Sequence, residues 1–108
     1  MKCPEFDTMG YPTDDTIKAI AEWPYKDEGG FEGLLDFVAS AWHWPRYWSR
    51  EGRTIHASTG GWSGNESIIA ALEENRVFWW MCWQQSRRGG HFVFEIPETV
   101  KAVEDVTK

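Results

Sequence analysis

The twenty residues from Val77 to Ile96, VFWWMCWQQSRRGGHFVFEI, decide which fold class the sequence predicts. The first part of this stretch is aromatic and β-branched, and Gly89-Gly90 separates it from a second apolar run, His91–Ile96. Two such runs around a two-residue glycine turn are typical of a β-hairpin. A competing interpretation continues one helix from Glu66 to Arg87. We favour the hairpin because Phe78-Trp79-Trp80 suits a strand better than a helix.

Two segments before this stretch have the amphipathic period of helices. The first begins after Thr13, whose hydroxyl suits an N-cap, and stops before Pro24. The second starts at Phe31 and ends at Pro45. The residues that follow, Arg46 to Arg53, are predicted to form a polar aromatic loop.

A strand, a glycine-rich turn and a third helix are predicted in the middle of the chain. Thr54–Thr59 alternates and is rich in β-branched residues, which indicates a short strand. Ser63 and Glu66 match a capping box, and Asn75 is expected to end the helix in the left-handed conformation. With the hairpin, these elements predict an α+β domain whose small, mainly antiparallel three-stranded sheet is packed with helices.

The chain has 108 residues, the size of one domain. Residues 1–12 are expected to be an irregular lead-in, and residues 98–108 a C-terminal extension in which three valines at helical spacing suggest a weak helix. The longest apolar run, Val77–Trp83, is too short to span a membrane, and no signal peptide is expected from residues 1–10. Cys3 and Cys82 are expected to be reduced thiols, so a cytoplasmic location is predicted.

Composition narrows the classes of function. A formal net charge of −6 argues against direct binding of nucleic acid or of an anionic membrane, because both require a basic surface. An aromatic share of 16%, with eight tryptophans, supplies enough apolar surface for a folded domain. We expect Trp42, Trp79 and Trp83 to lie in the core. On a strand, Trp79 and Trp83 would share one face and Trp80 would point to the other.

The glycine-rich turn is the first candidate site. Three glycines followed by a helix start would aim backbone N–H groups at one point, an arrangement that binds phosphate or carboxylate. The alternative is a tight strand-to-helix turn without a ligand. The candidate ligand- or partner-binding residues here are Thr59, Gly60, Gly61, Trp62, Ser63, Asn65 and Glu66.

The predicted hairpin tip is the second candidate. Arg87 and Arg88 could bind an anion through their guanidinium groups, with Ser86 and His91 nearby. The alternative is a solvated turn. If the tip folds back over the glycine-rich turn, the two segments would form one anion pocket walled by Trp62.

The third candidate is the aromatic segment Trp42–Trp48, from which Trp44 is taken as a candidate to contact a partner, after Trp62. Here the alternative is packing at a helix end. His43, His56 and His91 lack metal-binding spacing, so no metal or cofactor is predicted. Catalysis is not expected, although Ser63 paired with His56 or His91 would leave a hydrolase open.

Two motifs, 59-TGGWSGNE-66 and 86-SRRGGH-91, resemble those of a family of small uncharacterised bacteriophage and prophage proteins. The resemblance covers roughly Thr13 to Ile96 and implies a phage accessory role without naming a reaction. We therefore expect a non-catalytic protein in the cytoplasm of an infected bacterium that binds and inhibits or modulates a host protein, such as a defence factor. The alternative is a binder of a small anionic ligand such as a nucleotide. Homodimerisation is a further expectation.

Overall fold

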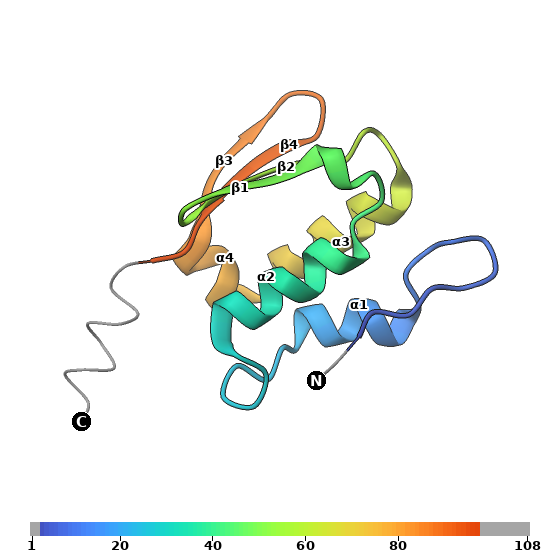
Figure 1. The fold of residues 1–108 in the computed structure, drawn as a ribbon, viewed down its shortest axis with the longest axis horizontal. Coiled ribbons are helices and arrows are strands. Elements are labelled where there is room, and N and C mark those ends of the chain that lie inside the picture. The colour runs from blue at the N-terminus through green and yellow to red at the C-terminus, as the bar shows by residue number, and fades with distance from the viewer. Residues whose placement is uncertain (1–2, 98–108) are drawn as a thin grey trace.

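The computed structural model describes residues 3–97. Two α-helices come first along the chain, and a pair of strands, a pair of helices and a second pair of strands follow (Figure 1). In chain order the elements are α1 (Asp14–Ala21), α2 (Gly30–Ala41), the 3-10 helix η1 (Pro45–Tyr47), β1 (Trp48–Glu51), β2 (Thr54–Ser58), α3 (Ser63–Glu74), α4 (Arg76–Cys82), β3 (Trp83–Arg87) and β4 (His91–Glu95).

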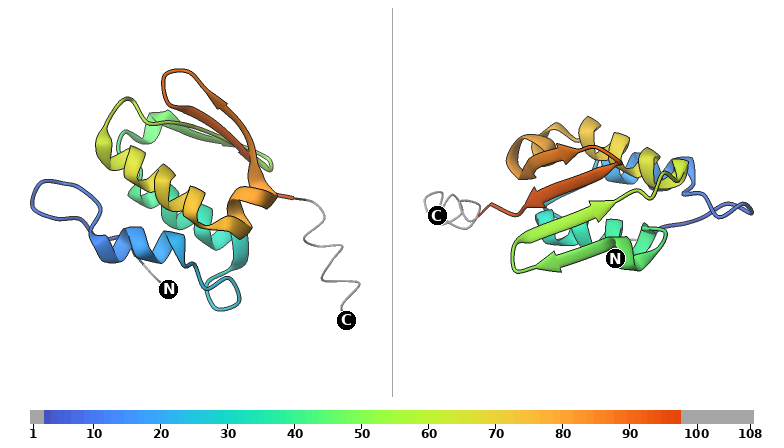
Figure 2. Two further views of the ribbon diagram at one scale, coloured as in Figure 1. Left: turned by 180° about the vertical axis from the view of Figure 1, so that it is seen from behind. Right: turned by 90° about the horizontal axis from the view of Figure 1, so that it is seen from above.

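The strands form one antiparallel sheet in the order β1-β2-β4-β3. Helices α2 and α3 lie under one face of this sheet, and α1 lies beyond them against α3 (Figures 1 and 2). No helix of residues 3–97 covers the opposite face, which is turned toward the viewer in the right-hand panel of Figure 2. The α+β class is therefore confirmed, and the sheet has one open face.

The core lies between the sheet and the helices. Strand alternation turns Ile55, Ala57 and Phe94 toward the helices, where all three are fully buried. The same alternation leaves His56, Ser58 and His91 on the open face, where each is only partly buried. The largest fully buried side chains are Phe78, Phe94, Ile20, Leu34, Leu35, Ile55, Ile68, Leu72 and Val38.

The prediction of three strands is wrong because the expected loop from Arg46 to Arg53 contains β1. This strand pairs with β2 across a tight turn at Gly52, whose φ is +62°. Trp48 packs on the buried Trp42, with ring centroids 5.3 Å apart. Arg50 forms a bidentate ion pair with Glu32 on α2. These contacts with distant parts of the chain stabilise a strand that has little β-propensity of its own.

Both interpretations of the Val77–Arg88 stretch are partly wrong, because the chain forms α4 and then β3 there. The Asn75 side chain accepts a hydrogen bond from the Phe78 N–H, 3.2 Å away, and so caps a new helix. At Trp83 the backbone becomes extended and β3 begins. The predicted turn at Gly89-Gly90 is confirmed, but its loop has three residues because Arg87 pairs with His91.

The tryptophan predictions have different outcomes. Trp42 is buried, with 3% of its surface exposed, as expected. Trp79 is only partly buried, and Trp83, expected in the core, is 41% exposed. The predicted arrangement of Trp79 and Trp80 on opposite faces of a strand is also wrong, since both lie on α4.

The helix-end predictions also have different outcomes. The Thr13 hydroxyl accepts a hydrogen bond from the Thr16 N–H at 3.2 Å, so this N-cap is confirmed. The capping box is wrong, because Ser63 is the first residue of α3 and Trp62 occupies the cap position without a side-chain bond. Asn75 is not left-handed, since its φ is −76°.

Asn75 instead links three helices. Its amide donates to the Ile20 carbonyl at 2.9 Å, and its Oδ1 accepts from the Tyr25 hydroxyl at 2.6 Å. Burial raises the pKa of Tyr25 to about 12, although the hydrogen bond to Asn75 opposes that shift. The end of α1 is thereby joined to the junction of α3 and α4.

Two further points concern the cysteines and the membrane. Cys3 is exposed and Cys82 is buried, and both are free thiols. Burial raises the pKa of the Cys82 thiol to about 12. Among residues 3–97, no helix has the length and apolar character needed to cross a bilayer. The weak helix predicted for residues 98–108 lies outside the described residues.

Candidate functional site

The two predicted motifs meet in the structure. The Thr59 N–H donates to the Gly90 carbonyl at 3.0 Å, so the glycine-rich turn and the β3–β4 hairpin tip are in direct contact. A Cβ on Gly90 would clash with the Thr59 hydroxyl, which explains why glycine stands there. The Thr59 side chain is buried and its Oγ1 accepts from the Gly61 N–H at 3.3 Å. Thr59 therefore acts as a structural link between the two motifs.

Asn65 holds this end of the molecule together. It is fully buried, and its Oδ1 accepts from the His43 N–H at 3.0 Å. Its amide donates to the carbonyl of His43 at 3.1 Å and to that of Thr59 at 3.2 Å. All of these partners are backbone groups of the chain. Asn65 therefore fixes two loops and offers no free polar atom to a ligand.

Trp62 covers the start of α3. A Cβ on Gly64 would clash with the Trp62 indole, so the ring lies directly over the first turn of the helix. Ser63, on that turn, donates to the Tyr11 hydroxyl at 3.0 Å. Glu66 is exposed on the same helix. The ring of Trp62 occupies the region in which an anion would approach the N–H groups of the helix.

Five rings form a continuous row at this end, which we call the aromatic ladder: Tyr11, Trp62, His43, Trp44 and Tyr47. Successive ring centroids are 4.8, 4.5, 4.6 and 5.6 Å apart, and the planes are tilted by 37°, 32°, 57° and 69°. The guanidinium of Arg46 lies 5.3 Å from the centroid of the last ring. Trp44 and Tyr47 remain 37% and 36% exposed. The ladder is thus internally packed but keeps an outer surface open to solvent.

The backbone beneath the ladder is unusual. Trp44 has a φ of +60° and is the one non-glycine residue among residues 3–97 with a positive φ. Such a conformation is strained for a bulky side chain. A Cβ on Gly60 would lie 2.6 Å from the Trp44 ring and 2.9 Å from the Tyr47 ring. A side chain at position 60 would therefore displace both rings.

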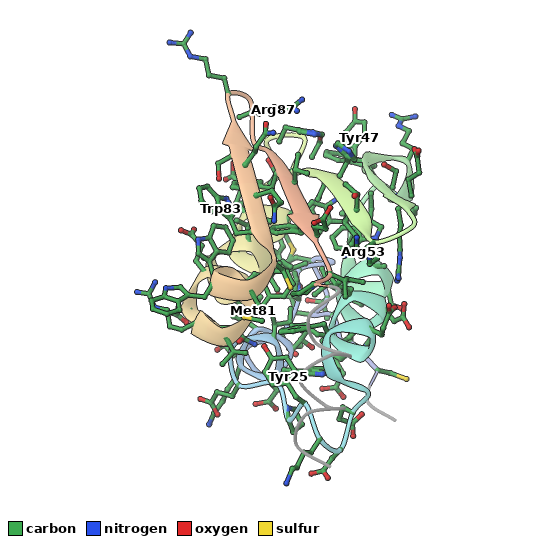
Figure 3. All side chains as sticks on the ribbon, turned by 90° about the vertical axis from the view of Figure 1, so that its left-hand side faces the viewer. Tyr25, Tyr47, Arg53, Met81, Trp83 and Arg87 are labelled. Carbon is green, nitrogen blue, oxygen red and sulfur yellow. The ribbon has the colours of Figure 1, made fainter. Side chains whose placement is uncertain are left out.

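The arginines of the hairpin tip point into solvent. Arg87 and Arg88 are exposed, and Arg87 donates to the Gln85 side chain at 2.9 Å. Figure 3 shows Arg87 at the same end of the molecule as Tyr47. Ser86, the remaining candidate on this turn, accepts from the Trp83 indole N–H at 2.9 Å. Between described residues, the single ion pair joins Arg50 to Glu32, so neither tip arginine is neutralised within residues 3–97.

A chain of three polar groups lies on the open face of the sheet. The Ser58 Oγ is 2.7 Å from the His91 Nδ1, and the His91 Nε2 is 3.2 Å from the His56 Nδ1. Burial, together with the charge of Arg87 and the ring of His56, lowers the pKa of His91. A neutral His91 can exchange a proton with the Ser58 hydroxyl. The hydrogen bond of Ser63 goes to Tyr11, so the serine that contacts a histidine is not the one the sequence suggested.

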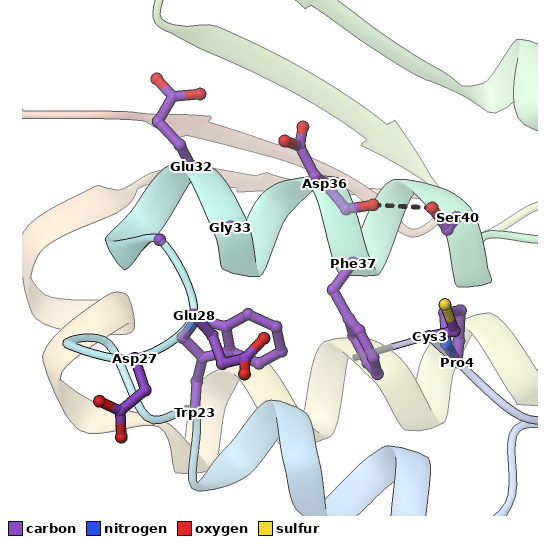
Figure 4. A pocket seen from close by; sticks show the side chains of 11 residues that line it. Cys3, Pro4, Trp23, Asp27, Glu28, Glu32, Gly33, Asp36, Phe37 and Ser40 are labelled. Carbon is purple, nitrogen blue, oxygen red and sulfur yellow. Dashed lines mark hydrogen bonds between the residues drawn. The ribbon is translucent and has the colours of Figure 1, made fainter. Parts of the chain in front are cut away.

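A pocket of about 510 Å³ lies away from the open face of the sheet, between α2, the loop before it and the residues Cys3 and Pro4 (Figure 4). Asp27, Glu28, Glu32 and Asp36 line it together with Trp23, whose buried indole Nε1 has no hydrogen-bond partner within residues 3–97. Residues 3–36 contain nine acidic and two basic side chains, whereas residues 37–97 contain five and six. The negative charge is therefore concentrated in the first third of the chain.

An exposed apolar surface on α4 and the start of β3 was missed by the sequence analysis. We call it the α4 surface; it consists of Val77, Trp80, Met81 and Trp83, with exposed fractions of 55%, 86%, 41% and 41%. Met81 and Trp83 point outward from it in Figure 3. The i, i+3, i+4 spacing of its first three members places them on one face of a helix. The sequence analysis predicted a strand for this segment, and on a strand the same spacing does not indicate a shared face.

Comparisons with known proteins give no relative. No protein-family model, no curated protein and no solved structure matches this chain.

Proposed function

We propose that this protein is a non-catalytic binding protein that docks on a partner protein through the outer surface of the aromatic ladder. Trp44, Tyr47 and Arg46 are exposed on that surface, as is His43. Tryptophan, tyrosine and arginine are the side chains most enriched at energetically important positions of protein interfaces. The chemistry of the surface therefore fits a partner with an apolar pocket bordered by carboxylates.

The observation that carries this proposal is how firmly the exposed rings are held. Trp44 keeps a left-handed backbone, which costs on the order of 1 kcal/mol, and Gly60 leaves room for its ring. Asn65 is buried entirely in order to fix the two loops from which the rings project. Packing of a core would require neither the strained backbone nor the buried amide. Both features serve to hold Trp44 and Tyr47 in fixed positions at the surface. Strain of this kind is characteristic of binding sites.

The ladder suits a protein partner better than a stacked base or sugar. Its rings touch one another at centroid distances of 4.5–5.6 Å, so no slot between them is wide enough to admit a planar ligand. Their tilts of 32–69° also prevent a continuous flat platform. The formal charge of −6 further disfavours a polyanion.

The alternative, a small anionic ligand, has less support. Thr59 and Asn65 use their side-chain atoms inside the protein, and Trp62 lies over the start of α3. Only Arg87 and Arg88 remain as exposed cationic groups of the proposed anion site. The phage resemblance adds the expectation that the partner is a bacterial host protein.

The test is affinity capture from a bacterial lysate after nuclease treatment, with three versions of the full chain as bait. The wild type and Trp80→Ala, a matched removal of an exposed tryptophan far from the ladder, are expected to retain the same partner. The double variant Trp44→Ala/Tyr47→Ala is expected to capture at least tenfold less of this partner, because hot-spot rings typically each contribute 2 kcal/mol or more to the binding free energy. A partner that the double variant retains, or that Trp80→Ala loses equally, would overturn the proposal.

A further inference from the structure

Two of the three histidines meet on the open face of the sheet. His56 on β2 pairs with Val93, and Ser58 pairs with His91, so the two histidines are diagonal neighbours on adjacent strands. The His56 Nδ1 and the His91 Nε2 face each other at 3.2 Å, with ring planes tilted by 35°. A single proton lies between these two nitrogens when they share a hydrogen bond, since one must donate and the other accept.

We propose that His56 and His91 form a two-histidine chelate for a divalent late transition metal ion, of which Zn²⁺ is the one to test. Imidazole nitrogens are preferred ligands of Zn²⁺, Cu²⁺ and Ni²⁺. In a tetrahedral zinc site with Zn–N bonds of about 2.0–2.1 Å, two nitrogens lie about 3.3 Å apart. The observed separation of 3.2 Å is therefore close to what the ion requires. The metal ion takes the place of the shared proton, and His56 then carries its proton on Nε2.

Ser58 positions one ligand. Its Oγ lies 2.7 Å from the His91 Nδ1, so it can accept a hydrogen bond from that nitrogen and leave the lone pair of Nε2 directed toward His56. Histidine ligands in metal sites almost always donate their second ring N–H to a fixed acceptor in this way. All three side chains project from central strands, so the geometry rests on the sheet and not on a loop.

The chelate leaves coordination positions open. Within residues 3–97, no group of three His, Cys, Asp or Glu side chains could hold a metal ion together, so solvent or an added ligand must complete the shell. Arg87 pairs directly with His91 across β3 and β4. Its positive charge opposes a bare dication but attracts an anion to the metal. The site therefore fits a zinc ion that carries an exchangeable anionic ligand, such as a phosphate or carboxylate group.

Calorimetric titration with ZnCl₂ tests the proposal on untagged protein carrying Cys3→Ser, because the exposed Cys3 thiol could itself bind zinc. We expect one equivalent to bind, and His56→Ala or His91→Ala to weaken binding at least tenfold. His43→Ala is the matched control and should leave it unchanged, since His43 lies in the aromatic ladder. Equal affinity in the wild type and in the His56 and His91 variants, or no binding at millimolar zinc, would overturn the proposal.

Two further measurements separate ligation from structural damage. Ser58→Ala should weaken binding about tenfold, whereas Ser58→Thr, which keeps the hydroxyl, should restore it. Arg87→Gln should strengthen zinc binding, which damage to the sheet would not do. If a histidine variant fails to fold, imidazole nitrogen NMR on the wild type provides the test. Zinc must then shift the resonances of His56 Nδ1 and His91 Nε2, and shifts confined to the His43 resonances would refute the site.

Discussion

The aromatic ladder and the α4 surface both expose tryptophan, but they differ in what lies beneath the rings. Each ring of the ladder contacts a neighbouring ring, and the loops that carry them are fixed by Asn65 and by the close fit of Gly60. Trp80, the centre of the α4 surface, is 86% exposed and projects from a seven-residue helix. Exposure is greater on α4, whereas structural support is greater at the ladder.

This difference shows that the exposed area of an aromatic side chain and its preorganisation are separate properties. A rigidly held ring loses little conformational freedom when a partner binds, so more of its contact energy appears as affinity. A freely exposed ring must first be ordered. The ladder is consequently the better candidate for a specific interface, although it exposes less apolar surface per residue.

Replacing Asn65, which fixes the loops beneath the ladder, should cause the largest loss of stability. Asn65→Ala leaves the N–H and the carbonyl of His43 without their partners and removes one of the two donors to the Thr59 carbonyl, which also accepts from the Trp62 N–H. With the loss of a fully buried side chain, we expect a loss of about 3 kcal/mol in the free energy of unfolding. Urea denaturation followed by tryptophan fluorescence measures this loss. Asn65→Asp keeps the acceptor for the His43 N–H but places a carboxylate against two carbonyls, so it should be destabilised as well. A loss below 1 kcal/mol in Asn65→Ala would show that the ladder does not depend on this amide.

The two glycines of the turn provide a sharper comparison. Gly60 and Gly61 both have positive φ, +65° and +77°, so alanine at either position brings backbone strain of about 1 kcal/mol. Only at Gly60 does the added Cβ also meet the rings of Trp44 and Tyr47. Gly60→Ala should therefore lower the free energy of unfolding by about 2 kcal/mol and alter the near-UV circular dichroism spectrum. Gly61→Ala should lower it by about half as much and leave the spectrum unchanged. Equal costs with identical spectra would contradict the close fit.

How much of this could be predicted from the sequence depends on the range of the contacts. The Thr13 cap and the position of the Gly89-Gly90 turn rest on neighbouring residues; both are confirmed, although the loop is one residue longer than predicted. Strand β1 depends on pairing with β2 and on Arg50 meeting Glu32, eighteen residues away, and was missed. At α4, three aromatic residues suggested a strand, yet the cap from Asn75 and packing against the core favour a helix.

The candidate site shows the same division. Glycines and aromatic residues in the sequence singled out two motifs, and the structure brings these two motifs into contact. The structural role of Asn65 could not be predicted, because its partner His43 lies 22 residues away. The pairing of His56 with His91 likewise depends on the strand register, and a one-residue slip would place them on opposite faces.

Mild acid should weaken the ladder's end before it affects α4. The pKa of His91 is lowered in the folded protein, so the unfolded chain takes up the proton first as the pH falls. Stability is therefore fully present above about pH 6.5 and decreases as the pH falls from there through the lowered pKa. Urea midpoints at pH 7.5 and 5.5 measure the decrease, and His91→Gln should reduce it. The protection factors of amides near Gly90, which correct for the slower intrinsic exchange in acid, should fall at pH 5.5 while those of α4 do not; an equal fall at both places would contradict this prediction.

The smallest effect is expected at the most exposed ring. Trp80→Ala removes a side chain that is 86% exposed, so the free energy of unfolding should change by less than about 0.5 kcal/mol. Trp79→Ala is the matched comparison on the same helix, because its ring packs on Trp83 and Phe94, with centroids 5.8 and 5.7 Å away. That variant should lose about 2–3 kcal/mol. If urea denaturation shows equal losses for both, α4 supports its exposed rings as firmly as the ladder does, and the distinction between the two surfaces disappears.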